Sequence, residues 1–270
     1  MKKLAFLVFA GILGIAAQAL GQTPAQAPAA APAKPRTATA PKTGMAVKSA
    51  AASVRTYDRA LLRPALLKDK APETFQVKFT TTRGDFTATI TRAWAPLGAD
   101  RFYNLVKHHF YDNASFFRVI PAFVVQFGIS AYPPVSAAWA NANIKDEPVI
   151  GSNKRGYLTY AKTSQPNTRS TQIFINLKDN AGLDRQGFSP FGVVDAEGMK
   201  VVEMLYDQYG DNGPDQDQLT KLGKPYVDKS FPKVDTIKSA TLIKPAGAAA
   251  PAKAKPAAAP KPPAPASKPQ

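Results

Sequence analysis

The sequence predicts a mainly β fold, an antiparallel barrel or sandwich with helices at its ends. Short runs in which apolar and polar residues alternate recur over residues 74–243, as expected for strands that place one face on a core. Turns rich in Gly, Asn and Pro separate these runs. Few stretches have helical spacing, so a parallel sheet, which needs a crossover helix between strands, is not favoured.

The first two strands are predicted to form a hairpin. FQVKFTTT and DFTATITR both alternate, and Arg83-Gly84-Asp85 lies between them as the turn. A helix is then expected from Pro96, because proline suits the first helical turn and apolar residues follow at helical spacing. His108 and His109 come near its end, where a packing or capping role is expected.

Five further strands are predicted, followed by a second helix and a closing strand. The five strands are SFFRVI, FVVQFGI, RGYLTYAK, TQIFINL and SPFGVV. GMKVVEMLY predicts a helix that begins near Glu197, and TIKSATLI predicts the last strand. Ahead of the first strand, Tyr57–Leu67 predicts one short helix that is interrupted at Pro64.

The composition limits the chemistry that the chain can perform. It has no Cys and only two His, which excludes disulfides, thiolate nucleophiles and Cys-ligated zinc and leaves little for a Ser-His-Asp triad. Four aspartates lie close together in the first part of the segment 207–234, namely Asp207, Asp211, Asp215 and Asp217. Their spacing does not match an EF-hand calcium loop. We therefore expect no metal and no cofactor, and we interpret the segment 207–234 as an added polar surface loop.

The net charge of +16 first suggests a nucleic acid or an anionic surface as partner. Residues 74–243 contain 19 Lys and Arg against 16 Asp and Glu, so this segment has a net charge of +3 and the flanks carry the remaining +13. Because the basic character belongs to the ends of the chain, nucleic-acid binding by the folded segment is not expected.

Residues 1–21 are predicted to be a signal peptide. Lys2 and Lys3 precede the apolar stretch 4–17, which is too short to span a bilayer comfortably, and small-x-small cleavage patterns end at Ala19 and Gly21. An uncleaved membrane anchor is the alternative. The prediction is an exported protein, periplasmic rather than fully secreted, with no stable membrane insertion after cleavage.

Residues 22–55 and 244–270 are rich in Ala, Pro and Lys and are predicted to be a disordered linker and a disordered tail. Solvated spacers are the simpler interpretation, and weak contact with anionic envelope polymers is the alternative. The domain division that follows places a transitional segment at 56–73 and the folded domain at 74–243.

Ordered motifs in the folded segment resemble those of the cyclophilin family. FFRVIPAFVVQ at 116–126 resembles the signature F-x-R-V-I-P-x-F-x-x-Q, and GYLTYAKT at 156–163 and PNTRSTQIFI at 166–175 resemble two further family motifs. Leu183-Asp184 and FGVV at 191–194 follow in family order. The resemblance implies an eight-stranded antiparallel barrel capped by two helices, a monomer, and cofactor-free peptidyl-prolyl isomerase activity on Pro-containing polypeptides.

The resemblance also implies an apolar pocket on the outer face of the barrel that holds the substrate proline. Arg118 is the implied catalytic residue, Gln126 orients it and contacts the peptide, and Gln172 is a second polar contact. The implied pocket walls and rim are Phe123, Val124, Ala161, Lys162, Phe174, Leu183 and Phe188. From the strand pattern alone, Arg118 is equally an arginine on a solvated face, and the apolar residues are equally barrel core.

Three positions depart from the family pattern. Gly182 replaces an aromatic residue, Phe188 replaces His or Tyr, and Lys162 replaces Asn, while Phe127–Ser130 replaces a Gly-Gly-Asp-like turn. We expect weak cyclosporin binding, because the family uses the aromatic side chain missing at Gly182. Isomerase activity is expected to persist, and a non-catalytic module or chaperone that binds Pro-containing segments is the alternative.

Overall fold

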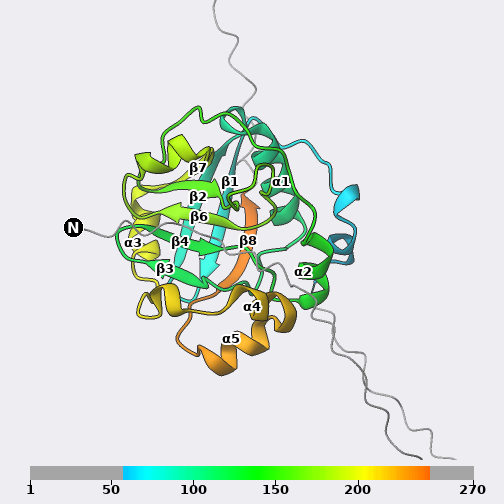
Figure 1. Ribbon diagram of the computed structural model, residues 1–270, viewed down its shortest axis with the longest axis vertical. Helices are drawn as coiled ribbons and strands as arrows, with labels where there is room; N and C mark the ends of the chain where they lie inside the picture. Colours follow the sequence, from blue (N-terminus) through cyan, green and yellow to red (C-terminus); the bar gives the residue numbers. More distant parts are fainter. Residues whose placement is uncertain (1–56, 244–270) are drawn as a thin grey trace, which may run out of the picture.

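Eight antiparallel strands form one curled sheet in the computed structural model, which describes residues 57–243 (Figure 1). The strands are β1 (Thr74–Thr81), β2 (Asp85–Thr91), β3 (Arg118–Ile120), β4 (Val124–Phe127), β5 (Tyr157–Tyr160), β6 (Ile173–Asn176), β7 (Pro190–Val194) and β8 (Ile237–Ile243). Their order is β3-β4-β6-β5-β7-β2-β1-β8. A bridge between Ser115 and Thr236 joins the two edges, so the sheet curls round to the closed form that the sequence predicted.

All eight strands lie where the alternating runs predicted them. β1 and β2 form the predicted hairpin, with Thr80 opposite Asp85. Gly84 in its turn has φ +129°, a conformation that favours glycine. Every second residue of β1 is buried, including Phe75, Val77 and Phe79. The predictions for the signal peptide and the Ala/Pro/Lys-rich ends fall on residues 1–56 and 244–270, which lie outside the described residues.

Aromatic and branched aliphatic side chains fill the inside of the curled sheet. Phe79 stacks on Phe86 with ring centroids 4.7 Å apart, and its ring meets that of Phe127 edge-on at 5.9 Å. Phe102 of the first helix packs against Phe191 of β7 at 5.2 Å. The core therefore contains residues from both sheet edges and from the covering helix.

The two helices predicted within residues 74–243 are present. α1 (Pro96–Lys107) packs on β7 and β8, and α3 (Ala196–Val202) packs on β2. Asp195 caps the start of α3 by accepting a hydrogen bond from the backbone N–H of Gly198 at 2.6 Å. His108 follows α1, and its Nδ1 lies 2.6 Å from the carboxylate of Asp58, a contact that lowers the pKa of Asp58. Its backbone N–H donates to the carbonyl oxygen of Asn104 at the end of α1, so the backbone of His108 closes the helix while its imidazole pairs with Asp58.

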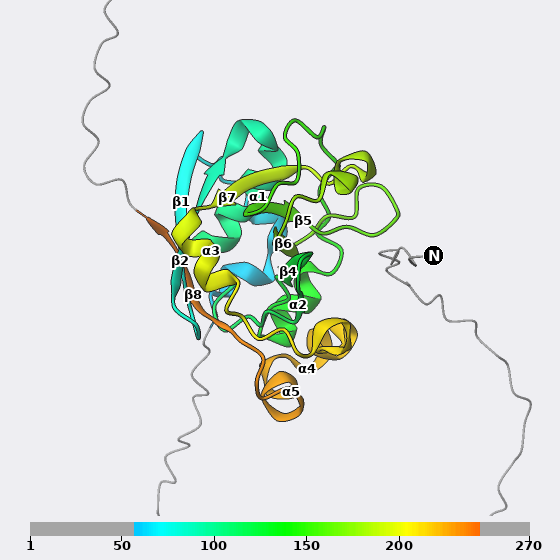
Figure 2. The same cartoon turned by 90° about the vertical axis from the view of Figure 1, so that its left-hand side faces the viewer.

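Three further helices were not predicted. α2 (Pro133–Trp139) packs on α4 (Gln216–Leu222), and α4 packs on α5 (Lys224–Ser230), at one end of the curled sheet (Figures 1 and 2). The prediction of a polar surface loop over 207–234 was wrong, because this segment folds as α4 and α5 and buries Leu219 and Val227 against Phe117 and Ile129. Helices of seven residues depend on tertiary packing, so their own sequence gives a weak signal.

The segment before β1 also differs from its prediction. Two 3-10 turns, η1 (Arg59–Leu62) and η2 (Pro64–Leu66), replace the single short helix, because Pro64 lacks the N–H that a continuous helix needs. Trp139 of α2 donates a hydrogen bond to the carbonyl oxygen of Leu61 at 2.8 Å, which ties this segment to the fold. The remaining 3-10 turns are η3 (Arg92–Trp94), η4 (Ala181–Gln186) and η5 (Gly210–Asn212).

Across residues 57–243, none of the helices combines the length and the apolar character required to cross a bilayer.

Candidate active site

Strand register places three of the predicted site residues in one row. Arg118 of β3 lies opposite Gln126 of β4, and Gln126 lies opposite Phe174 of β6. Directly opposed residues in neighbouring strands share a face of the sheet. Val125 and Ile175, which are the next residues along and also oppose each other, belong to the main core. The row therefore lies on the outer face of the curled sheet.

A second apolar cluster, separate from the main core, covers this part of the outer face. Phe174 and Phe188 meet edge-on with ring centroids 5.8 Å apart. The cluster consists of Val124, Ala161, Phe174, Leu183 and Phe188, with Phe123 packed against it. Its members are thus distinct from the barrel interior, which was the alternative interpretation of these residues.

These side chains surround a small hollow with the guanidinium at its edge. The lining residues are Arg118, Phe123, Val124, Gln126, Ala161, Phe174, Leu183 and Phe188. All eight are among the ten residues that the sequence singled out. The other two, Lys162 and Gln172, line a neighbouring cavity together with Ala161.

Arg118 is held among polar and aromatic partners. Its side chain is 17% exposed, and its guanidinium carbon lies 5.9 Å from the ring centre of Phe123. One Nη1 hydrogen points to Gln126 Oε1 at 3.5 Å, while Gln126 Nε2 donates to Gln172 Oε1 at 2.8 Å. The bond to Gln172 thus turns the acceptor oxygen of Gln126 toward Arg118. The sequence did not predict a further partner, Asp211, whose Oδ1 accepts from Arg118 Nε at 2.6 Å.

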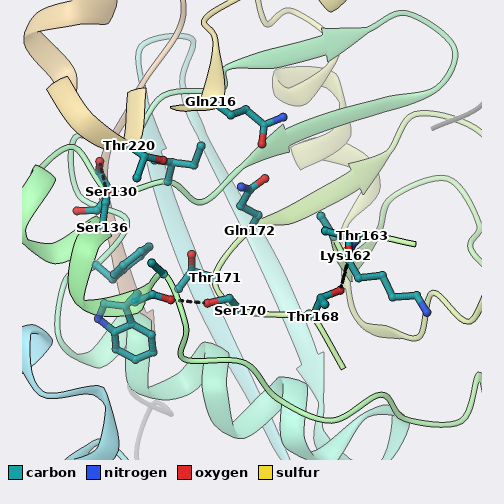
Figure 3. Close-up of a pocket in the computed structure, with 15 residues that line it drawn as sticks. Ser130, Ser136, Lys162, Thr163, Thr168, Ser170, Thr171, Gln172, Gln216 and Thr220 are labelled. Carbon is teal, nitrogen blue, oxygen red and sulfur yellow. Dashed lines mark hydrogen bonds between the residues drawn. The ribbon is translucent and has the colours of Figure 1, made fainter. Parts of the chain in front are cut away.

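The neighbouring cavity has a volume of about 270 Å³ (Figure 3). Gln172 and Thr171 of the segment before β6 line one side, and Gln216 and Thr220 of α4 line the side that faces them. Because Ala161 lines both the hollow and this cavity, a peptide bound in the hollow can extend into the cavity. The cavity depends on α4, which the sequence analysis missed.

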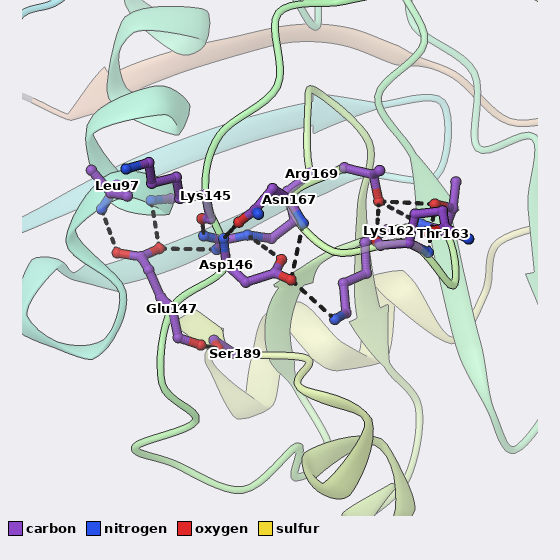
Figure 4. A network of polar contacts seen from close by, with 12 residues as sticks. Leu97, Lys145, Asp146, Glu147, Lys162, Thr163, Asn167, Arg169 and Ser189 are labelled. Atoms are coloured by element: carbon purple, nitrogen blue, oxygen red, sulfur yellow. Dashed lines mark hydrogen bonds and ion pairs between the residues drawn. The ribbon is translucent and has the colours of Figure 1, made fainter.

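Lys162 lies against the apolar cluster. Its Nζ is 5.6 Å from the ring centre of Phe188 and 3.5 Å from Asp146 Oδ2. Its side chain is largely buried, and Figure 4 shows the amine directed at the Asp146 carboxylate. The Phe188 ring lies on another side of the amine.

Glu147 and Arg169 anchor the stretch between α2 and β5, for which the sequence gave no element (Figure 4). The Glu147 carboxylate accepts from the backbone N–H groups of Leu97 and Gly98 at 2.6 and 3.0 Å, so it caps the N-terminus of α1. It also accepts from Arg169 Nη1 at 2.9 Å. Arg169 is 1% exposed, and the pairing therefore compensates a buried charge in the loop that follows Lys162.

A network of buried asparagines supports the hollow from below, and the sequence analysis missed it as well. Asn153 donates to the carbonyl oxygen of Phe188 at 2.8 Å and to Asp184 Oδ1 at 2.7 Å. Asn180 donates to the carbonyl oxygen of Phe123 at 3.0 Å. Burial acts to raise the pKa of Asp184, but hydrogen bonds from the Ser152 hydroxyl and from Asn153 outweigh it and hold the pKa below its usual range. Two walls of the hollow are thus fixed through their backbones.

Open space surrounds Gly182, the residue next to the hollow-lining Leu183. It lies in η4 directly before Leu183, and a Cβ added at this position would meet no atom within 4 Å. The missing aromatic side chain is therefore not replaced by a neighbour at this point of the described structure.

In the part of the chain that the structure describes, no group of three or more His, Asp or Glu side chains is arranged to hold a metal ion.

The chain is similar to several known proteins. Residues 76–224 match the family model described as "Cyclophilin type peptidyl-prolyl cis-trans isomerase/CLD". A peptidyl-prolyl cis-trans isomerase of Acinetobacter baylyi is 37% identical over 134 residues, covering 48% of this chain and 70% of that protein. Peptidyl-prolyl cis-trans isomerase A of Dickeya dadantii is 34% identical over 151 residues, covering 54% of this chain and 78% of that protein. A cyclophilin-type isomerase of Cryptosporidium parvum superposes with a TM-score of 0.45 at 20% identity, over 63% of this chain and 98% of that one.

Proposed function

The chain belongs to the cyclophilin-type peptidyl-prolyl cis-trans isomerase family, and from that premise we propose that it accelerates cis/trans exchange at X–Pro bonds of polypeptides. In this proposal the proline ring occupies the outer-face hollow. Arg118 is the catalytic residue, and Gln126 and Gln172 hold the peptide beside it.

The reaction makes few chemical demands on the site. The two isomers of an X–Pro bond are separated by roughly 18–20 kcal/mol, and uncatalysed exchange takes tens of seconds or longer. No covalent bond breaks, so the reaction requires no nucleophile, metal or general base. The amide loses its resonance as it twists, and its nitrogen then acquires lone-pair character. A fixed N–H donor directed at the prolyl segment favours this twisted state over either planar isomer.

The arrangement of Arg118, Gln126 and Phe174 in one row is the observation that carries the proposal. It places a part-buried guanidinium beside an apolar wall, so the wall packs against the proline ring while the guanidinium donates hydrogen bonds. Arginine suits this role because its planar group has donors in fixed directions.

We further propose that the substrates are exported proteins whose folding is limited by the rate of proline isomerisation. This rests on the signal-like residues 1–21 and on the location they predict. The basic ends act as spacers, with weak contact to anionic envelope polymers as the alternative. The monomeric state and the absence of nucleic-acid binding remain predictions.

A proline-limited refolding assay with the full chain tests the proposal. Wild type should accelerate refolding, and Arg118→Ala should lower kcat/KM about 100-fold, the loss typical of removing a donor to a developing charge. Arg155→Ala is the matched control, since Arg155 also forms one ion pair, to Glu203 at 2.6 Å, but does not line the hollow. Circular dichroism should be the same for all three proteins. A well-folded wild type that does not accelerate refolding would overturn the proposal.

A non-catalytic module or chaperone that binds Pro-containing segments is the second candidate. The open space at Gly182 and the wholly apolar side chain at Phe188 favour it. Both positions offer fewer contacts that could hold the amide in its twisted state. Binding of a Pro-containing peptide, without any acceleration of refolding, would select this candidate.

A further inference from the structure

The segment 207–234 brings a carboxylate to Arg118 from far along the chain. Asp211 Oδ1 accepts from Arg118 Nε at 2.6 Å, although the two residues are 93 positions apart. The Asp211 side chain is 67% exposed and that of Arg118 is 17% exposed, so the pair lies at the edge of the hollow. The contact engages Nε and leaves the two terminal nitrogens of the guanidinium for Gln126 and for substrate.

The turn that carries Asp211 is fixed against β3. Gly213 lies so close to the strand that a Cβ there would come within 2.5 Å of the carbonyl oxygen of Phe117, the residue before Arg118. On the other side of Arg118, Ile120 Cδ1 would lie 4.0 Å from a Cβ added at Gly210. Within the turn, Gly210 N–H donates to the carbonyl oxygen of Asp207 at 2.9 Å. Asp211 is therefore held at the strand by its own backbone, and its position does not depend on the ion pair alone.

An arginine side chain has several rotatable bonds, and ordering it when substrate binds costs free energy. A charge-assisted hydrogen bond at Nε sets the plane of the guanidinium before substrate arrives. Gln126 is too far from Nη1, at 3.5 Å, to do this alone. We propose that Asp211 is a positioning residue, which orients Arg118 so that its terminal N–H groups point into the hollow. This inference rests on the proposed isomerase function and on Arg118 as its catalytic residue.

The opposite role for the same contact is a lock, in which Asp211 competes with substrate for Arg118. A positioning residue and a lock predict opposite changes in rate when the carboxylate is removed. The contact favours the positioning role, because Asp211 bonds only to Nε and leaves the terminal N–H groups of Arg118 available to substrate.

Steady-state kinetics on the full chain distinguish these roles. Asp211→Ala should lower kcat about tenfold with KM changed less than about twofold, the scale expected when one hydrogen bond to a charged group is lost. Asp211→Asn keeps an acceptor oxygen at the same place and should recover most of that loss. Asp217→Asn is the matched control, because it removes one charge from the same segment without touching Arg118.

A double-mutant cycle of Asp211→Ala and Arg118→Ala distinguishes a positioning role from a purely structural one. If Asp211 acts only through Arg118, then Asp211→Ala should cause no further loss when it is added to Arg118→Ala. The melting temperatures of the Asp211 variants should stay within a few degrees of wild type, since exposed ion pairs contribute little to stability.

Each failure has its own signature. An active wild type together with an Asp211→Ala variant of equal or higher rate overturns the positioning role, and a higher rate identifies a lock. An equal loss in the presence and absence of Arg118 also overturns it, because the effect would then be structural. An inactive wild type instead overturns the proposed function. In that case the NMR signal of Arg118 Nε–H still tests the contact, because a distinct signal in wild type should be lost in Asp211→Ala if Asp211 orders the side chain.

Discussion

Replacing Asn153 by alanine is expected to loosen one wall of the hollow and to destabilise the fold. Asn153 is fully buried, and its amide is hydrogen-bonded to four groups around the site. It donates to the Phe188 carbonyl oxygen at 2.8 Å and to Asp184 at 2.7 Å, and it accepts from the Thr159 hydroxyl at 2.7 Å. Alanine removes these three bonds and a longer one that Asn153 Oδ1 accepts from Asn176 Nδ2 at 3.4 Å. The Phe188 carbonyl and the Thr159 hydroxyl then lose the partners they have in the wild type.

The expected cost follows from those two buried groups. A buried polar group that loses its partner costs about 1–3 kcal/mol, so the free energy of unfolding should fall by about 3 kcal/mol. For a folded unit of this size that corresponds to a melting temperature lower by about 6–12 °C. KM for a Pro-containing peptide should rise, because the Phe188 backbone is no longer fixed.

Chemical and thermal unfolding followed by circular dichroism, together with KM, provide the assay. Asn143→Ala is the control, since Asn143 is exposed and its loss should change stability by less than about 0.5 kcal/mol. If Asn153→Ala unfolds like this control, the argument that the asparagine network supports the hollow is wrong.

Three further predictions concern the surroundings of the hollow. The pKa of Asp184 is lower in the folded state than its ordinary value of 3.8, so its stabilisation is complete above that pH and is lost as the pH falls through the folded value. The difference in unfolding free energy between wild type and Asp184→Asn should therefore stay constant from neutral pH to about 4 and shrink below it, whereas a constant difference at lower pH would contradict this. Gly128→Ala should cost about 2 kcal/mol or more, because Gly128 has φ +107° and a Cβ would lie 2.4 Å from the carbonyl oxygen of Thr171. Thermal unfolding beside Gly151→Ala, where a Cβ meets nothing within 4 Å, checks it, and equal melting temperatures would refute it. Gly182→Trp should lower KM for a Pro-containing peptide about two- to fivefold, because an indole there can occupy the open space without strain, and an unchanged or higher KM would count against this view of the hollow.

The site residues within the strands could be predicted because strand geometry is local. A side-chain period of two sends Arg118, Gln126 and Phe174 to one face and Val125 and Ile175 to the other. The family motif then indicated which face binds substrate. The assignment of roles to these residues stays a prediction until the variants are measured.

The partners of the site residues could not be predicted in the same way. Asp211 looked like one of several aspartates in a polar loop, and no role was predicted for Asn153. Their contacts, to Arg118 and to Phe188, join residues 93 and 35 positions apart. Neither contact follows from the periodicity of a strand or a helix, so the sequence pattern does not predict it.

The sequence by itself determined the eight strands, the two helices within residues 74–243 and the outward-facing row of Arg118, Gln126 and Phe174, because alternation and helical spacing act over a few residues. Only the tertiary structure decided that the segment 207–234 folds as α4 and α5 and brings Asp211 to Arg118. Short helices and single long-range hydrogen bonds gain their stability from packing against the finished sheet. Their positions therefore depend on surfaces that exist only once the chain has folded.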